Sequence, residues 1–227
     1  MGSLIAAALA RAHGFLLEPA VTPEAPAPVP LETWKPVHVV VTGLSRGSGA
    51  TTVAAGLAHA LCVPGLRSSH LVTIGAPSSG APPQPPGIVR WELPVALQDA
   101  REIAEYSTTL ARLAAGGGQA AVVWDVQADH VHRATDVMET SDAIVCVAEG
   151  SAEPSLCTLV CDMLAERYGR VLLVANRVGD AESWSSCCAA AIPDARLAAL
   201  LLARGRKPGG ALGESLARLA SLLEEPS

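Results

Sequence analysis

Residues 44–52, LSRGSGATT, have the composition of a loop that binds phosphate groups. Such a loop holds an anion with successive backbone N–H groups and with the N-terminus of the helix that follows. Gly47 and Gly49 supply the backbone freedom that this arrangement needs. Thr51 stands where a magnesium-binding hydroxyl is expected, and Thr52 follows it. The alternative is a glycine turn that only joins a strand to a helix.

The charge of this loop is unusual for phosphoryl transfer. Ala50 occupies the position before Thr51 where such loops carry lysine, and the chain's two lysines, Lys35 and Lys207, lie far from the loop in sequence. Arg46 is the cation within the loop, and its guanidinium could donate to a phosphate or point to solvent. Because phosphoryl transfer needs positive charge against developing negative charge, we expect slow or absent hydrolysis.

A second group of chemically capable residues lies in the stretch DVQADHVHR, which contains Asp125, Asp129, His130 and His132. Two carboxylates beside a His-x-His pair could bind a metal ion. The favoured interpretation is a loop that faces a nucleotide or a partner. Farther along, Arg204, Arg206 and Lys207 form a basic turn, which is either a solvated surface or a contact for phosphate or a partner.

The six cysteines include the adjacent pair Cys187 and Cys188, and none forms a CxxC motif. We therefore favour buried thiols in a reducing compartment over a zinc site. An iron–sulfur role for Cys187 and Cys188 is the alternative.

The elements that must position these residues alternate from Val37 onward. Apolar stretches typical of buried strands alternate with helical patterns. The predicted strands are VHVVVT, HLVTIG, AAVVWD, DAIVCVAE and RVLLVANRV, and the predicted helices are residues 50–62, 95–115, 154–169, 194–204 and 211–224. Near-continuous apolar strands between helices indicate an α/β fold with a mostly parallel sheet covered by helices on both faces.

The N-terminal part has a different pattern. Apolar residues at helical spacing predict an amphipathic helix within residues 1–18, and a proline-rich linker covers residues 19–36. The domain then occupies residues 37–227. The helix could pack on its own domain or dock on a partner protein, and the long linker favours a partner.

Composition limits the function classes. The net charge of −6 argues against sequence-independent nucleic-acid binding, and no apolar run reaches the ~18 residues of a membrane span. The acidic end GESLARLASLLEEPS lacks the basic face that anionic lipids attract. We expect a cytoplasmic protein, recruited to a membrane-associated or polar complex if it meets a membrane at all.

Several stretches together resemble the MinD/ParA family of P-loop ATPases over residues 37–224. LSRGSGATT resembles the family's deviant Walker A motif, and VVWD, ending at Asp125, resembles the strand that carries the switch II aspartate. SDAIVCVAEGSAEPSL resembles a later strand and loop, and LLVANRV resembles the strand whose asparagine, here Asn176, contacts adenine beside Arg177. IPDARLAALLLARGRKPGG resembles the family's proline–aspartate turn and late helix.

This resemblance implies a P-loop NTPase-like fold, a homodimer, and a site for ATP or ADP with Mg²⁺. It implies that Asp125 is a switch II relic and that Thr51 binds the metal. The nucleotide-binding residues that it implies are Arg46, Gly47, Ser48, Gly49, Ala50, Thr51, Thr52, Asn176 and Arg177.

The departures from the family pattern shape the expected function. Ser45 and Ala50 stand at the family's two lysine positions, and Gly75, Ala76 and Pro77 stand where it places aspartates. The chain therefore resembles a degenerate branch that includes TadZ/CpaE and septum-site-determining proteins. That resemblance implies a spatial organiser or assembly adaptor, for example of a pilus or secretion apparatus, with weak or no hydrolysis and a partner bound by the N-terminal helix.

Two other functions stay open. One is an active ATPase that uses Arg46 in place of lysine to position a cargo. The other is a metallochaperone-like protein that uses Cys187 and Cys188 at a dimer seam.

Overall fold

The computed structural model describes residues 37–63, 66–74, 85–93, 105 and 120–225. These residues belong to one compact unit that runs from Trp34 to Ser227. The predicted N-terminal helix, its linker and nearly all of the predicted helix 95–115 lie outside the described residues, as do Gly75, Ala76 and Pro77. None of the described helices is long and apolar enough to span a membrane.

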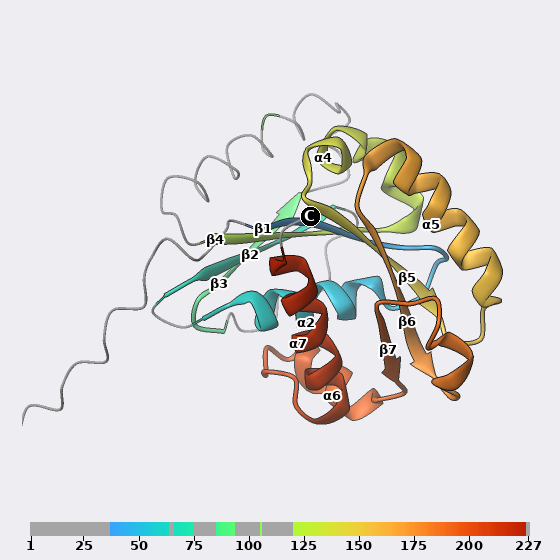
Figure 1. Ribbon diagram of the computed structural model, residues 1–227. Helices are drawn as coiled ribbons and strands as arrows, with labels where there is room; N and C mark the ends of the chain where they lie inside the picture. Colours follow the sequence, from blue (N-terminus) through green and yellow to red (C-terminus); the bar gives the residue numbers. More distant parts are fainter. Residues whose placement is uncertain (1–36, 64–65, 75–84, 94–104, 106–119, 226–227) are drawn as a thin grey trace, which may run out of the picture. The chain divides into compact units, whose positions relative to one another are not determined.

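Seven strands in the described part of the chain form one sheet in which every neighbouring pair is parallel (Figure 1). The spatial order is β3-β2-β4-β1-β5-β6-β7, so the first strand of the domain is central. The strands are β1 (Val37–Gly43), β2 (Ser68–Ile74), β3 (Ile88–Leu93), β4 (Ala120–Val126), β5 (Ala143–Glu149), β6 (Val171–Val178) and β7 (Ala190–Pro193).

Helices cover both faces of this sheet, which confirms the predicted fold class. One face packs against α2 (Ala50–Leu61), α6 (Arg196–Ala203) and α7 (Gly210–Glu224). The other packs against α4 (Thr135–Thr140), α5 (Pro154–Tyr168) and the short 3₁₀ segments η2 (Ala128–Arg133) and η3 (Glu182–Trp184). Successive residues of β1 point to opposite faces, so Val39 and Val41 join the first core and Val40 joins the second.

Small residues let α2 lie close to its neighbours. Gly56 faces α7, and a Cβ at this position would lie 2.3 Å from Leu216 Cδ1. Leu216 is fully buried in the same core as Leu57 and Ala58 of α2. The core on this face of the sheet thus consists of aliphatic side chains, whereas the core on the other face also buries Trp124 and Trp184.

Two strands at the edges of the sheet were not predicted. β7 has only four residues, AAIP, too few to show a period. In β3 the central residues Arg90 and Glu92 interrupt the apolar run, as is usual for an edge strand. The predicted helices 194–204 and 211–224 correspond to α6 and α7 within a few residues.

Replacing Leu216 by alanine should lower the free energy of unfolding by about 2–5 kcal/mol, because it leaves a cavity between α7 and α2. Urea unfolding followed by circular dichroism measures this change. Arg218→Ala, on the exposed side of the same helix, is the matched control and should change stability by less than about 0.5 kcal/mol. Equal effects of the two substitutions would contradict the packing described here.

Candidate nucleotide-binding site

The glycine loop lies where the carboxyl ends of β1, β4, β5 and β6 meet. In open parallel sheets this edge is the usual position of a ligand site. Gly47 and Gly49 have φ values of 81° and 91°, in the left-handed region that glycine adopts most readily. Helix α2 begins directly after Gly49 without a side-chain cap. No described acceptor takes the backbone N–H groups of Ala50 and Thr51, so they are available to an anion.

Asn176, at the end of β6, fastens the loop to the sheet. Its Nδ2 donates to the backbone carbonyl of Ser48 at 2.8 Å, and both residues are buried. The contact is close enough that a Cβ on Gly49 would lie 2.1 Å from the same Nδ2. Glycine is therefore required at position 49 by its neighbour as well as by its φ.

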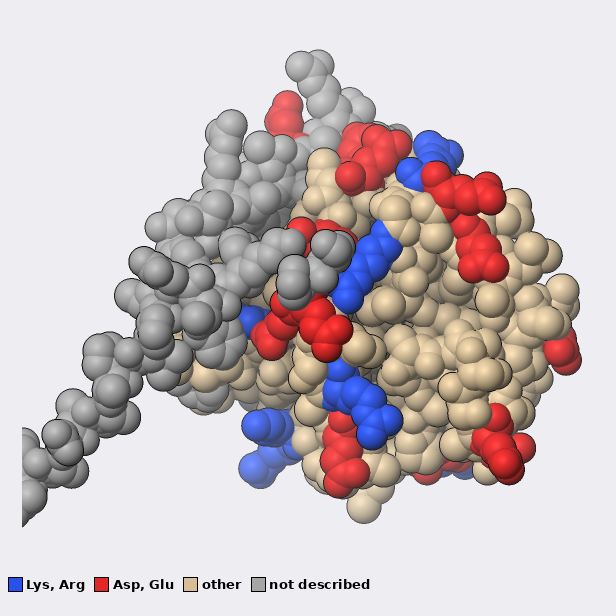
Figure 2. All heavy atoms as spheres, in the orientation of Figure 1, with Lys and Arg blue, Asp and Glu red and all other residues tan. Residues whose placement is uncertain are grey.

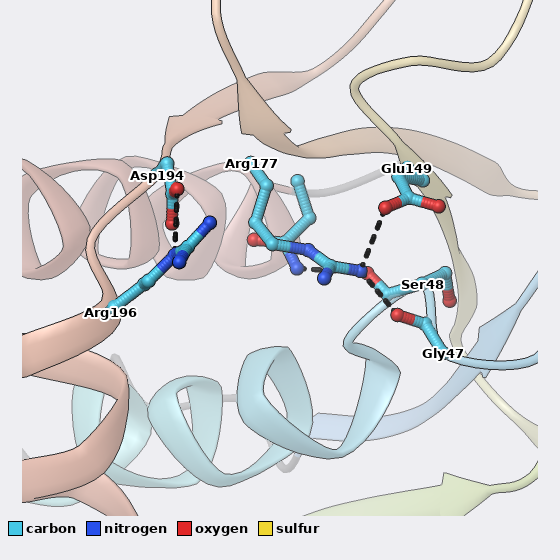
Figure 3. Close-up of polar contacts among 7 residues, drawn as sticks. Gly47, Ser48, Glu149, Arg177, Asp194 and Arg196 are labelled. Atoms are coloured by element: carbon cyan, nitrogen blue, oxygen red, sulfur yellow. Dashed lines mark hydrogen bonds and ion pairs between the residues drawn. The ribbon is translucent and has the colours of Figure 1, made fainter.

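Arg177 reaches the loop because the end of β6 is distorted. Its φ is 59°, the one positive value among the described residues other than glycine, and the pairing of β6 with β7 shifts register between Asn176 and Val178. Such an irregularity re-aims the side chain between the two positions. Figure 3 shows the Arg177 guanidinium between the carbonyl oxygen of Gly47, to which it donates, and Glu149 Oε1 at 3.3 Å.

Asp125, at the end of β4, is a buried carboxyl group with one oxygen unpaired. Thr51 Oγ1 donates to its Oδ1 at 3.3 Å, whereas Oδ2 is buried with no hydrogen-bond partner among the described residues. Burial raises the pKa of Asp125 from 3.8 to about 6, and the hydrogen bond from Thr51 acts in the opposite direction. A cation near Oδ2 would remove this imbalance.

Two cavities flank the loop. The first, of about 470 Å³, is lined by the loop, by Asp125 at the end of β4, and by Gln127 and Asp129 of the segment that follows β4. The second, of about 300 Å³, is lined by Gly47, Gly49, Thr52, Asn176, Arg177 and, opposite them, the start of α6. These volumes suit a small organic ligand.

The structure brings the predicted binding residues together at these cavities. Arg46, Gly47, Ser48, Gly49, Ala50 and Thr51 line the first, and Thr52, Asn176 and Arg177 line the second. Arg46 is exposed, and no hydrogen bond or ion pair joins its side chain to another described residue. None of the residues that line either cavity is a lysine.

Sequence reasoning missed Glu149 and the ion pair between Asp194 and Arg196. Glu149 ends the apolar strand β5, and its proximity to Arg177 depends on the pairing of β5 with β6. Asp194 Oδ2 lies 3.1 Å from Arg196 Nε at the far wall of the second cavity (Figure 3). The sequence signal for Glu149 was a charged residue at the end of an apolar strand, and Asp194 was noted only as part of the proline–aspartate turn.

The other candidate groups are not arranged around a metal. No group of three or more His, Cys, Asp or Glu side chains in the described part of the chain is placed to hold an ion. His130 and His132 belong to η2. Cys187 and Cys188 are half-buried against the core beside Trp184, and Cys187 Sγ donates to the Trp184 carbonyl oxygen at 3.5 Å.

Comparison with known proteins identifies the fold. No protein-family model and no curated protein matches the chain. Solved structures do match. One is a ParA family ATPase of Chlorobium tepidum, with 16% sequence identity and a TM-score of 0.61; the match covers 82% of this chain and 98% of that one. A MinC:MinD cell division complex of Aquifex aeolicus matches with 17% identity and a TM-score of 0.62, over 85% of this chain and 97% of that one. The septum site-determining protein MinD of Pyrococcus horikoshii, complexed with Mg-ADP, matches with 17% identity and a TM-score of 0.60, over 82% of this chain and 96% of that one.

At these identities the likeness shows the fold alone. The chain has the α/β fold of ParA and MinD ATPases, as the sequence resemblance implied.

Replacing Asp125 by asparagine should stabilise the protein in a pH-dependent way. The folded state holds the Asp125 proton up to about pH 6, whereas the unfolded chain releases it near 3.8, so folding is penalised increasingly between these values and fully above them. Asp125→Asn should therefore raise the unfolding free energy by about 3 kcal/mol at pH 7 and by little at pH 4.

Urea titrations at both pH values measure this difference, with Asp129→Asn, on an exposed neighbour, as the control. A stabilisation that is the same at pH 4 and pH 7 would show that ionisation of Asp125 is not its source.

Alanine substitutions at the two glycines separate local strain from the contact with Asn176. Both residues have positive φ, which costs an alanine about 1–2 kcal/mol. A Cβ at Gly47 meets nothing within 4 Å, whereas at Gly49 it collides with Asn176. Gly49→Ala should therefore be more destabilising than Gly47→Ala in thermal unfolding, and equal losses would contradict the fastening of the loop by Asn176.

Proposed function

We propose that this chain binds ATP or ADP with Mg²⁺ and hydrolyses the nucleotide slowly or not at all. The observation that carries the proposal is the buried, unpaired oxygen of Asp125 beside Thr51 at the start of α2. It lies on the same cavity as the open N–H groups of the loop, so oxygen ligands for a cation and donors for an anion occur together.

The residues present fit a magnesium nucleotide. The backbone N–H groups around Ala50 and Thr51 would bind phosphate oxygens, and Thr51 with Asp125 would supply oxygen ligands to the metal, the group that would neutralise phosphate charge. The second cavity, which adjoins the loop, would take the nucleoside, with Asn176 at its wall. Because Asn176 also holds Ser48, the same side chain would set the distance between the nucleoside and phosphate positions.

The absence of lysine side chains from the loop supports slow hydrolysis. Ser45 and Ala50 carry no charge, and the guanidinium of Arg177 is engaged by Glu149 and by the Gly47 carbonyl oxygen. Loss of a single preorganised donor to a transition state costs about 3–4 kcal/mol in enzymes of other classes. Without either lysine, the site would keep its backbone donors and lose much of its stabilisation of developing charge.

The biological role we propose is that of a spatial organiser or assembly adaptor, acting as a homodimer that forms face to face across the nucleotide loops when nucleotide is bound. The solved structures of similar fold include MinD of one organism complexed with Mg-ADP and MinD of another in a complex with MinC, so this fold occurs both with a bound nucleotide and with a protein partner. Residues 1–18 would recruit the partner on the proline-rich linker. The resemblance to TadZ/CpaE makes a pilus or secretion apparatus the assembly we would examine first.

An active ATPase is the second candidate, because Arg46 lines the first cavity with no hydrogen bond or ion pair to another described residue. Its guanidinium could then act on the phosphates in place of a lysine. A phosphate-release assay on the wild type and on Arg46→Ala decides between the two. Turnover that disappears in Arg46→Ala supports the ATPase, and release no faster than the buffer blank excludes it.

Restoring the lysine should strengthen nucleotide binding. We expect Mg-ATP to bind the wild type measurably in titration calorimetry, and Ala50→Lys to tighten binding by about tenfold or more, since a charged donor adds about 1.5–3 kcal/mol. Ala50→Met, of similar length without the charge, should leave the affinity near that of the wild type. Absence of binding in both the wild type and Ala50→Lys would overturn the proposal of a nucleotide site.

A further inference from the structure

The outer face of α5 has an uncovered apolar stripe. Leu156, Leu159, Val160 and Met163 are between 43% and 64% exposed, although their side chains are large and apolar. Their spacing of three, four and seven residues places them on one side of the helix. The opposite side packs on the sheet through Cys157 and Cys161, so the stripe is a second apolar face and not the edge of the core.

Helix α6 has a similar face. Leu197, Leu200 and Leu201, again at helical spacing, are between 42% and 71% exposed. Leu202 on the inner side is buried in the core that α2 and α7 share. Contiguous exposed apolar residues of this kind are characteristic of interaction surfaces in soluble proteins.

The two stripes carry opposite charges at their margins. On α5, Asp162 and Glu166 follow Leu159 and Met163 by three residues, and neither forms an ion pair with a described residue. Arg167 also lies on the outer side, but it is paired with Glu139. Acidic groups gather at the upper right of Figure 2, over the region that Figure 1 labels α5.

On α6 the charges are basic. Arg204 lies four residues after Leu200 on the same side, and the end of the helix fixes the residues that follow. Gly205, with φ 75°, donates to the Leu202 carbonyl oxygen, and Arg206 donates to that of Leu201 at 3.0 Å. These bonds form a Schellman motif that holds the backbone of Arg206 beside the stripe.

The two stripes cannot cover each other within one molecule. The inner residues of α5 belong to one core and those of α6 to the other, so the two stripes face away from opposite sides of the sheet. A second copy presents each stripe with its complement. Two α5 faces would bring acidic margins together, and two α6 faces would bring basic ones together, so like charges disfavour symmetric pairing.

We propose that the stripe of α5 docks against the stripe of α6 of a second copy, in a head-to-tail contact. Apolar side chains meet across its centre, and Asp162 and Glu166 face Arg204 and Arg206 at its margin. A contact between single helices is small by the standard of stable dimers, so the association is weak and depends on concentration and salt. Because a pair joined in this way keeps one free α5 stripe and one free α6 stripe, such a contact adds molecules in series.

This assembly goes beyond the proposed function, because it uses surfaces outside the two cavities and requires no nucleotide. It is tested on the full chain without nucleotide by sedimentation velocity over a wide range of protein concentration. The wild type should form species larger than a dimer as its concentration rises, and added salt should reverse this. A wild type that stays monomeric, or that stops at a dimer, overturns the proposal.

Two variants identify the faces. Leu159→Ser/Met163→Ser removes the α5 stripe, and Leu197→Ser/Leu200→Ser removes the α6 stripe. Each variant alone should be monomeric, and an equimolar mixture should form a one-to-one complex that grows no further, since each partner keeps one different face. Assembly of either variant alone to the size of the wild type, or no complex in the mixture, contradicts the head-to-tail contact.

Exchanging the charges at the margins of the two stripes tests the contact without changing its apolar residues. Asp162→Arg/Glu166→Arg and Arg204→Glu/Arg206→Glu should each abolish assembly, and combining all four changes in one chain should restore it. All of these positions are exposed, so circular dichroism melting curves should match the wild type. Failure of the combined variant to assemble overturns the assignment of the charged margins. Binding of the wild type to anionic vesicles without self-association overturns the assignment of a second copy of this chain as the partner.

Discussion

The hydrogen bond from Asn176 Nδ2 to the Ser48 carbonyl oxygen joins groups that are 128 positions apart in sequence, and the site depends on it. The loop belongs to no helix or strand, and beside its own turn and a backbone bond to β5 it is held by this contact from β6. That contact admits only glycine at position 49, and it sets where α2 begins. The position of Thr51 opposite Asp125, and so the boundary between the two cavities, follows from it.

The charge distribution of the site is asymmetric. Asp125 is buried, and one of its oxygens has no partner among the described residues. The guanidinium of Arg177, on the second cavity, is held by Glu149 and by a loop carbonyl, so Arg46 is the cation that lines the cavity of Asp125. Such a site can hold a ligand that brings its own cation more readily than a bare anion. Architecture and catalysis are therefore separable on this scaffold: main-chain donors persist as long as the fold does, whereas catalytic side chains depend on single positions.

The sequence was sufficient for features that arise from local pattern. Apolar strands, the glycine loop and the helix after it predicted the parallel sheet, and the order of motifs pointed to Asn176. Features that depend on pairing between distant strands were not accessible. Glu149 lies beside Arg177 only because β5 pairs with β6 and because β6 is irregular at its end, and neither fact has a local signal. β3 and β7 were missed because edge strands are short or interrupted by charge.

The central place of β1 has a consequence for biosynthesis. This strand emerges from the ribosome first in its domain, but its two neighbours are β4 and β5, whose residues are translated much later. Until then VHVVVTG has no partner strand on either side, and its apolar residues Val39–Val41 are available to other nascent chains. Helix α2, which can form locally, would shield only one of its faces in the meantime. Production of this protein should thus depend on holding chaperones during translation more than that of proteins whose strands pair in the order of synthesis.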